Sequence, residues 1–208
     1  LQAAGHEVSG FFMQLESPSR PWSRPAASAD PVDALADAHR VADFLGVELQ
    51  VWDLAERFNR VVMDSFVQAY RDGLTPNPCV HCNRFIKFGY VVERALREGF
   101  DYVATGHYAR LWRPDQAGLI PESIPQTGAD GAFPNFALLR GSAMGKDQSY
   151  VLAGALAAAL ARAVFPLGDV TDKAATRAEA QALGIPVAGK RDSFDICFIP
   201  DGDTRAVS

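Results

Sequence analysis

Residues 47–73, VELQVWDLAERFNRVVMDSFVQAYRDG, decide the fold class of this chain. The run from Val47 to Trp52 is typical of a short β-strand. From Ala55 to Arg71 the apolar residues recur at helical spacing, and Gly73 follows as a stop signal. The stretch therefore predicts a strand that leads directly into an amphipathic helix.

The alternation of strand and helix continues on both sides of this stretch. Upstream we expect a buried strand from Val8 to Met13, then a helix capped by Asp30, with Pro31 at its first position and Gly46 just past its end. Downstream we expect helices over 84–97, 149–164 and 173–183, and strands over 102–105 and 136–140. This order predicts an α/β fold with a largely parallel sheet.

Composition narrows the class of protein. The 208 residues are 48% hydrophobic and 22% charged, which is ordinary for a globular domain or a domain with an appendage. The net charge of −5 gives no overall basic field, so any RNA binding must rest on a local basic patch. Three cysteines are too few, and odd in number, for a secreted disulfide framework.

No segment has the features of a targeting or membrane-spanning sequence. The first ten residues lack the basic and apolar regions of a signal peptide. The longest apolar run, Tyr150 to Ala161, is shorter than the roughly 20 residues that cross a bilayer. We therefore expect a cytoplasmic protein with no membrane partner.

Two further features concern the organisation of the chain. The stretch from Trp112 to Asn135 is rich in proline, glycine and polar residues, which predicts a long surface insertion. Residues 1–5 resemble the end of a helix with Gly5 as its cap, and the last residues stop without completing an element. We therefore expect the chain to be part of a longer protein.

The motif TPNPCVHCN, Thr75 to Asn83, interrupts the helical pattern. Its two prolines predict a turn without helix, so that Cys82 stands just before a helix that Asn83 caps. A helix N-terminus favours anions, and Arg84 and Lys87 add positive charge. The motif thus favours the thiolate form of Cys82.

The cysteines leave several interpretations open. Cys79 and Cys82 form a C-x-x-C pair, which is incidental in some proteins and reactive in others. Cys197 is either a small core residue or a second reactive thiol that exchanges sulfur with Cys82. Zinc is a further alternative, with the three cysteines and one histidine as ligands, either His81 or His107.

Two polar motifs lie near the expected strand ends. In ATGHYAR, Gly106 permits a ligand to approach the backbone closely, and His107 is either a phosphate or base contact or a structural residue. In LRGSAMGKDQSY, Lys146, Asp147 and Gln148 precede an expected helix. They either meet RNA phosphates or form a polar loop with a cap.

Taken together, these motifs resemble the bacterial and organellar tRNA-specific 2-thiouridylases over nearly the whole chain. TPNP-x-x-x-CN-x-x-IKF, ATGHY, KDQSY and ICFI form a highly specific set, in the order that the family has. The stretches that carry the resemblance are GHEVSGFFM, DALADAHRVADFLGV, GLTPNPCVHCNRFIKF, DYVATGHYAR, LLRGSAMGKDQSYVL, FPLGDVTDKAATRAEAQALG and KRDSFDICFI.

The resemblance implies a fold and a reaction. The fold is an adenine nucleotide alpha-hydrolase-like (PP-loop ATPase) α/β domain over residues 1–145, with the insertion at about 112–135. A mostly helical segment follows over residues 146–208 and leads to the second catalytic cysteine. The implied reaction is adenylation of the C2 oxygen of the wobble uridine in tRNA, delivery of sulfur from a cysteine persulfide, and release of AMP.

The resemblance also assigns residues and partners. Cys197 matches the persulfide-bearing cysteine and Cys82 the nucleophile, and a disulfide bond belongs to the same expectation. Met13 and Gly106 match contacts to ATP, which is expected with Mg²⁺. Expected partners are the tRNAs for glutamate, lysine and glutamine, and an upstream sulfur-carrier protein or cysteine desulfurase. The residues that match contacts to tRNA are Asn77, Pro78, Cys79, His107, Lys146, Asp147 and Gln148.

The chain departs from the family pattern in ways that leave alternatives. The family's SGGVDSS-type phosphate loop and its C-terminal β domains have no counterpart in these residues. The activity therefore belongs to the intact parent protein, and the alternatives are an inactive RNA-binding remnant or another PP-loop ATP pyrophosphatase. An iron–sulfur cluster on the three cysteines is a less favoured route than the persulfide.

Overall fold

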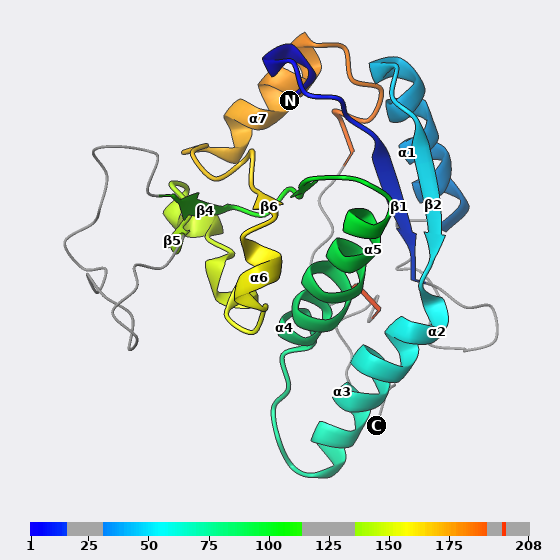
Figure 1. Ribbon diagram of the computed structural model, residues 1–208, viewed down its shortest axis with the longest axis vertical. Coiled ribbons are helices and arrows are strands. Elements are labelled where there is room, and N and C mark those ends of the chain that lie inside the picture. Colours follow the sequence, from blue (N-terminus) through cyan, green and yellow to red (C-terminus); the bar gives the residue numbers. More distant parts are fainter. Residues whose placement is uncertain (16–30, 114–135, 191–196, 199–208) are drawn as a thin grey trace. The chain divides into compact units, whose positions relative to one another are not determined.

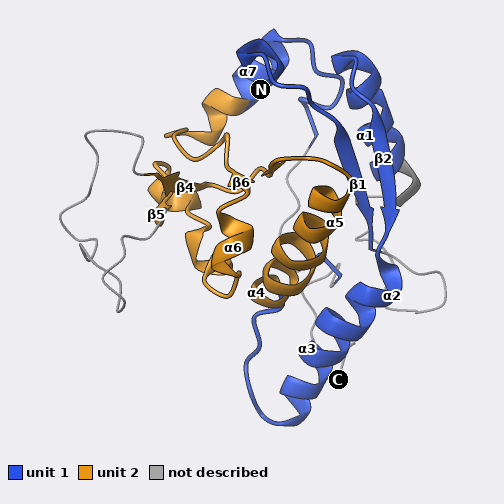
Figure 2. Cartoon of the chain, viewed as in Figure 1, with its two compact units in different colours: residues 1–78, 177–208 blue, residues 79–176 orange. Residues whose placement is uncertain are grey.

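The structure is a computed structural model that describes residues 1–15, 31–113, 136–190 and 197–198, except the side chains of residues 31–33. The chain divides into two compact units (Figure 2): residues 1–78 with 177–208, and residues 79–176. The first unit thus combines the two ends of the chain. Neither unit ends at residue 145, where the sequence was expected to divide, and that boundary stays a prediction.

The first unit contains the predicted strand–helix–strand arrangement (Figure 1). β1 (Gly10–Gln14) and β2 (Leu49–Asp53) pair in parallel, and α1 (Pro31–Leu45) contacts both strands. The register runs from Gly10 opposite Leu49 to Gln14 opposite Asp53. Gly46 ends α1 with a φ of 65°, as predicted, while the expected cap Asp30 lies outside the described residues. A short 3-10 turn, η1 (Gln2–Ala4), precedes β1, and Gly5 ends it with a φ of 84°.

The helix predicted over residues 55–71 is confirmed, with one change in its winding. It consists of α2 (Ala55–Phe58), the π-helical segment η3 (Asn59–Met63) and α3 (Asp64–Arg71). The Asp53 carboxylate accepts a hydrogen bond of 3.0 Å from the Ala55 N–H at the start of this helix. Its buried residues supply much of the core of the unit: Ala55, Phe58, Val62, Met63 and Phe66.

The second unit begins with a longer helix than the sequence predicted. It runs through α4 (Pro78–His81), the π-helical segment η4 (Cys82–Val91) and α5 (Val92–Arg97). The prediction that the prolines keep the helix from starting before Cys82 was wrong. Pro78 is the first residue of the helix, where the missing N–H costs nothing because no carbonyl precedes it in the helix. Gly89 suits the wider π turn, since a Cβ there would lie 2.8 Å from the Arg84 carbonyl oxygen.

Two further pairs of strands lie in the second unit. In the second unit β3 (Val103–Ala104) pairs in parallel with β6 (Ala163–Val164), and β4 (Ala109–Trp112) pairs antiparallel with β5 (Ala137–Arg140). With β1 and β2, two of the three pairs are parallel, and helices separate the two strands of each parallel pair along the chain. The chain therefore has the predicted α/β fold. None of the helices within the described ranges is long and apolar enough to cross a membrane.

The helix predicted over residues 149–164 was wrong. The segment forms two short helices, η6 (Ser149–Leu152) and α6 (Ala157–Leu160), and then β6. Strand pairing overrides the helical propensity of its alanines and leucines, because the Arg162 carbonyl accepts from Val103 at 2.8 Å and the Val164 carbonyl from Thr105 at 3.0 Å. The helix predicted over residues 173–183 is confirmed as α7 (Lys173–Ala182).

Trp112 corrects the expected start of the insertion. The sequence placed it in the polar loop, but it is the last residue of β4 and is buried. The strand beyond the insertion begins at Ala137, as predicted to within one residue. Residues 114–135 lie outside the described residues.

Two glycines allow the chain to pack closely around β4. A Cβ on Gly168 would lie 2.2 Å from the Ala109 carbonyl oxygen, and one on Gly141 would lie 2.6 Å from the Tyr108 carbonyl oxygen. The Ser142 N–H also donates to the Gly168 carbonyl at 2.9 Å, so the two glycine segments bond to each other. Backbone atoms cannot yield as a flexible side chain would, so these positions exclude any larger residue.

We predict that Gly168→Ala lowers the free energy of unfolding by about 2 kcal/mol, because the added methyl group overpacks against main-chain atoms. Urea unfolding followed by circular dichroism measures the change. Gly145→Ala is the matched control, since nothing lies within 4 Å of a Cβ at that position. Equal unfolding midpoints for the two variants would contradict the prediction.

Candidate nucleotide and RNA site

The helix that starts at Pro78 places the C-x-x-C cysteines in different surroundings. Cys79 is exposed in the first turn, whereas Cys82 lies one turn later and is only 8% exposed. The field of a helix N-terminus falls off within the first turn, so it acts on Cys79 more than on Cys82. The prediction that Cys82 stands immediately before the helix is therefore corrected.

Asn83 does not cap the helix, as the sequence had predicted. Its side-chain Nδ2 donates a hydrogen bond of 2.9 Å to the Cys79 carbonyl, which lies four residues earlier in the same helix. The side chain is buried, and its Oδ1 has no hydrogen-bond partner among the described residues. An unsatisfied buried acceptor is costly, so such an atom calls for a partner or a functional reason. The sequence pointed to this residue as a helix cap and gave no sign of a buried acceptor.

A small cationic and aromatic surface lies on the exposed side of the same helix. The Arg84 guanidinium carbon lies 4.9 Å from the centre of the Phe85 ring, and the His81 ring lies 5.8 Å from it. All three residues are exposed, as are Asn77 and Cys79. Pro78, in contrast, is buried. This surface places one guanidinium beside two rings, groups of the kinds that contact phosphates and stack on bases.

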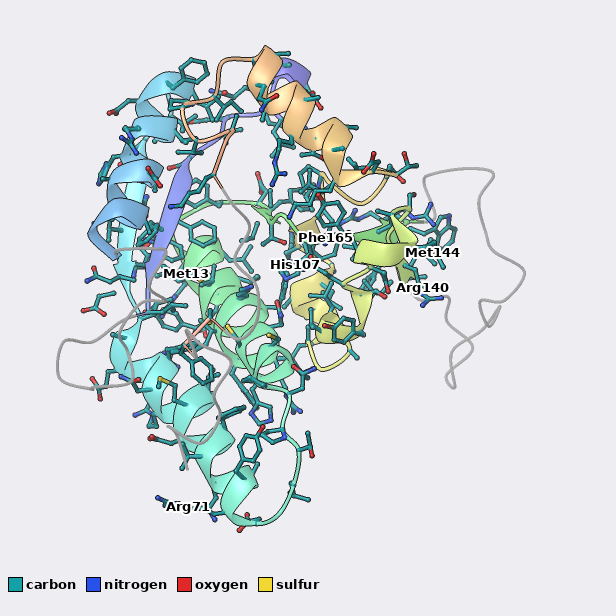
Figure 3. All side chains as sticks on the ribbon, turned by 180° about the vertical axis from the view of Figure 1, so that it is seen from behind. Met13, Arg71, His107, Arg140, Met144 and Phe165 are labelled. Carbon is teal, nitrogen blue, oxygen red and sulfur yellow. The ribbon has the colours of Figure 1, made fainter. Side chains whose placement is uncertain are left out.

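His107 lies in an aromatic cluster of the second unit (Figure 3). Its ring centre is 5.7 Å from that of Phe88 and 5.9 Å from that of Phe165. Its Nδ1 shares a hydrogen bond of 2.7 Å with the Thr105 hydroxyl. Burial, with a smaller contribution from the charge of Lys87, lowers the pKa of His107 to about 4. The imidazole is therefore neutral at neutral pH, and its predicted contact with tRNA cannot be an ion pair with phosphate.

Asp147 and Gln148 have partners within their own unit. The Asp147 carboxylate accepts hydrogen bonds from the Gly141 N–H at 2.9 Å and from the Ser149 N–H and hydroxyl at 3.2 and 3.0 Å. Gln148 bonds twice to Tyr108, accepting from its N–H at 3.1 Å and donating its own N–H to the carbonyl at 2.9 Å. These contacts fix the loop between β5 and η6 against β4.

The pKa of Asp147 agrees with its role as the acceptor that holds this loop together. Burial alone would raise its pKa, but the hydrogen bonds from Gly141 and Ser149, with the charge of Arg140, outweigh burial and lower the pKa below its usual range. The nearest guanidinium nitrogen of Arg140 lies 3.6 Å from the carboxylate. Lys146, in the 3-10 turn η5 (Met144–Lys146), and the neighbouring Met144 are exposed. Of the predicted tRNA contacts in this loop, Lys146 is thus the charged residue that faces solvent.

The two predicted ATP residues belong to different units. Met13 is a half-buried residue of β1, opposite Trp52 and one residue from the carboxyl end of the strand. Gly106 lies between β3 and β4, also after the carboxyl end of a parallel strand, where α/β sheets bind nucleotides. A Cβ on Gly106 would meet only the Leu167 Cδ1, at 3.7 Å, among the described residues. The backbone at Gly106 is therefore open to close approach, as the prediction requires.

Cys197 lies in the first unit and is exposed, while the adjacent Phe198 is buried. Of the two predicted sulfur-transfer cysteines, Cys197 is thus exposed in the first unit, and Cys82 is buried in the second. Among the residues that the structure describes, no three His, Cys, Asp or Glu side chains gather closely enough to hold a metal ion.

Comparison with known proteins identifies the family. The model of the tRNA methyl transferase HUP domain matches residues 1–201. The chain is 50% identical to a tRNA-specific 2-thiouridylase MnmA of Mycolicibacterium gilvum over 209 aligned positions, which cover 99% of this chain and 51% of that protein. It is 46% identical to the protein of the same name from Clavibacter michiganensis, covering 97% of this chain and 48% of that one.

The chain therefore belongs to the tRNA methyl transferase HUP-domain family. It spans about half the length of the curated relatives that it matches. The HUP domain agrees with the adenine nucleotide alpha-hydrolase-like fold that the sequence motifs implied. The family assignment made from those motifs is thus confirmed.

The buried His107 predicts a pH dependence of stability. Because its pKa is lowered from 6.5 to about 4, the unfolded chain binds a proton in this range that the folded chain does not. The stabilisation that comes from burying a neutral His107 is complete above pH 6.5. We expect the free energy of unfolding to fall by up to about 3 kcal/mol as the pH drops to about 4. Urea unfolding at half-unit pH steps measures this slope.

The variant His107→Gln is expected to flatten the slope between those pH values, because glutamine does not titrate. His39→Gln is the control, since His39 is exposed on α1 and should leave the slope unchanged. A slope that persists in His107→Gln would show that another group is responsible.

Proposed function

We propose that the intact protein thiolates tRNA, replacing the C2 oxygen of a uridine with sulfur in an ATP-dependent reaction. The observation that carries this proposal is the identity of 50% over 99% of the chain to a protein named for that activity. The cysteine motifs add to it, because an exposed thiol and a second cysteine within a helix supply the groups that sulfur transfer needs.

The chemistry requires activation of the uridine before sulfur arrives. The C2 oxygen is a poor leaving group, and its attack on the α-phosphate of ATP, with release of pyrophosphate, makes it part of a good one. The outer sulfur of the Cys197 persulfide then bonds to C2 as the bond to the activated oxygen breaks, and AMP leaves with that oxygen. The Cys82 thiolate attacks the inner sulfur of Cys197, the persulfide S–S bond breaks, and the sulfur stays on C2. The Cys82–Cys197 disulfide that forms is reduced by an external thiol before the next turnover. The position of Gly106 after β3 and of Met13 in β1 supports ATP use, with Mg²⁺ as the usual companion of its phosphates.

The proposed roles of the cysteines follow their surroundings. Cys197 carries the sulfur as a persulfide, and its exposure suits loading by a partner such as a sulfur carrier or cysteine desulfurase. Cys82 serves as the nucleophile, and its burial suits a thiol that reacts only with a bound partner. A cluster held by Cys79, Cys82 and Cys197 is the less favoured alternative, which an iron assay and a visible spectrum distinguish.

The proposed tRNA contacts divide into two kinds. Asn77, Cys79 and Lys146 are exposed and available for direct contact, together with the surface of Arg84 and Phe85. His107 and Asp147 act through the loop and strand that they hold in place, while Gln148 is exposed as well as bonded to Tyr108. The substrates expected from the resemblance are the tRNAs for glutamate, lysine and glutamine, modified at the wobble uridine.

We predict that the full-length protein forms 2-thiouridine on unmodified tRNA when supplied with ATP and a sulfur donor, and that Cys197→Ser abolishes it. Nucleoside mass spectrometry measures the product and also distinguishes it from a methylated uridine, the product that the family description would suggest. Unchanged thiolation in Cys197→Ser would remove that cysteine from the pathway. ATP-dependent binding of tRNA without thiolation would favour an inactive remnant or another ATP pyrophosphatase.

A separate prediction tests the ATP contact at Gly106. Gly106→Ala should leave the unfolding midpoint unchanged, because its Cβ meets only the Leu167 side chain at an ordinary distance of 3.7 Å. It should raise the KM for ATP at least tenfold, because the methyl group stands where the nucleotide approaches the backbone. Gly145→Ala is the control, with no change in either quantity. An unchanged KM in Gly106→Ala would place ATP elsewhere.

A further inference from the structure

Cys197 and Phe198 are neighbours in sequence with opposite surroundings. The Cys197 side chain is exposed, and Phe198 is only 7% exposed. The position of an exposed side chain is set by its backbone, and the backbone of Cys197 is joined directly to a residue that is packed. The packing of Phe198 therefore limits where the sulfur of Cys197 can be.

Phe198 packs between two rings of the long helix of the first unit. Its ring centre lies 5.7 Å from that of Phe58 at an interplanar angle of 74°, and 5.3 Å from that of Phe66 at 88°. Both contacts are edge-to-face, the arrangement that the charge distribution of aromatic rings favours. We call Phe58 and Phe66, which receive the Phe198 ring, the aromatic cage.

The cage is a rigid support. Phe58 is the last residue of α2 and Phe66 lies in α3, on either side of the π-helical segment η3. Val62, between them, is buried as well. Phe66 also contacts Tyr70, with ring centres 4.9 Å apart at 77°. The two rings that receive Phe198 therefore come from one continuous helix and are themselves buried.

A second contact of the same segment is weaker. Lys190 donates a hydrogen bond of 2.5 Å to the Asp37 carboxylate on α1, and Arg40 bonds to the same carboxylate. The Lys190 side chain is 43% exposed, so water and salt screen this ion pair in part. Phe198 is joined directly to Cys197 and Lys190 is not, so of these two described contacts that of Phe198 constrains the thiol more closely.

We propose that Phe198, held in the aromatic cage, is the residue that positions Cys197 for sulfur delivery. This inference rests on the proposed role of Cys197 as the persulfide carrier. In loading, the Cys197 thiolate attacks the outer sulfur of a donor persulfide. A new sulfur–sulfur bond forms, the donor's sulfur–sulfur bond breaks, and the donor leaves as a thiolate, with no net oxidation.

Loading and delivery make different demands on position. A small donor reaches an exposed thiol from many directions, so loading tolerates movement of Cys197. Delivery requires the outer sulfur to meet one carbon atom of a bound nucleotide, and misplacement by about 1 Å costs on the order of 100-fold in rate. Loss of the aromatic cage therefore slows delivery and spares loading.

The test uses the full-length protein with glutathione persulfide as the sulfur donor. In Phe198→Ala we expect loading of Cys197, measured by mass spectrometry of the intact protein, to stay within about twofold of the wild type. We expect single-turnover formation of 2-thiouridine from the loaded protein to fall between tenfold and 100-fold, with the KM for tRNA unchanged. Phe198→Leu should recover part of the rate, since leucine fills part of the cage.

Tyr70→Leu is the matched control. It removes a ring contact from Phe66 but keeps Phe198 and both residues of the aromatic cage, so we expect delivery within about twofold of the wild type. Phe66→Leu should slow delivery as Phe198→Leu does, and the double variant should be no slower than the slower single one. Urea unfolding of each variant shows whether a loss of rate follows merely from a loss of stability.

The outcomes separate this inference from the function on which it rests. A wild type that loads no persulfide on Cys197, or forms no 2-thiouridine, would contradict the proposed function itself. A wild type that does both, with delivery by Phe198→Ala and Phe66→Leu equal to its own, would overturn the role of Phe198. Equal losses of loading and delivery would also overturn it, because they would indicate general disruption of the segment.

Discussion

The helix from Pro78 to Arg97 is the element on which the second unit depends. Its buried residues, Cys82, Asn83, Ile86, Phe88, Val91, Val92 and Ala95, face the interior along most of its length. Ile86 and Phe88, two residues apart, lie on nearly opposite sides of the helix, and both are fully buried, so other segments cover this part of the helix from more than one side. Earlier in the helix Cys82 is buried, while Cys79, Arg84 and Phe85 lie in solvent. A packing constraint thus determines which groups near the motif are available for chemistry.

Hydrophobic patterning was sufficient to predict the strands and helices of the first unit. The β1–α1–β2 arrangement and the helix over residues 55–71 follow from apolar residues at periods that match their structures. Two of the predicted helices differed from the structure for identifiable reasons. Pro78 was taken as a barrier to the helix although the first helical position tolerates proline, and the alanine-rich stretch after Ser149 was assigned by propensity although pairing with β3 decides its last residues.

The sequence predicted which residues belong to the candidate site better than it predicted how their side chains are arranged. The motifs identified the residues, but sequence contains no information on which polar atoms pair with each other. Asp147 and Gln148 form an internal brace, and His107 is enclosed by aromatic rings and neutral. Asn83 was assigned to the helix cap because the burial of its side chain and the unpaired Oδ1 become visible only when its surroundings are known. The contact between Phe198 and Phe66 was equally invisible, because it joins residues far apart in the chain.

The pairing of β4 with β5 has a consequence for the length of the chain between them. The ladder from Ala109 opposite Arg140 to Trp112 opposite Ala137 fixes both ends of the connection, and Trp112 is buried at that point. The entropy of closing a loop grows only slowly with its length, by about 0.6 kcal/mol for each doubling. Because Trp112 and Ala137 face each other across the ladder, a sequence inserted between them starts and ends at neighbouring points, and a protein engineer can place a fluorescent reporter there without disturbing the two strands.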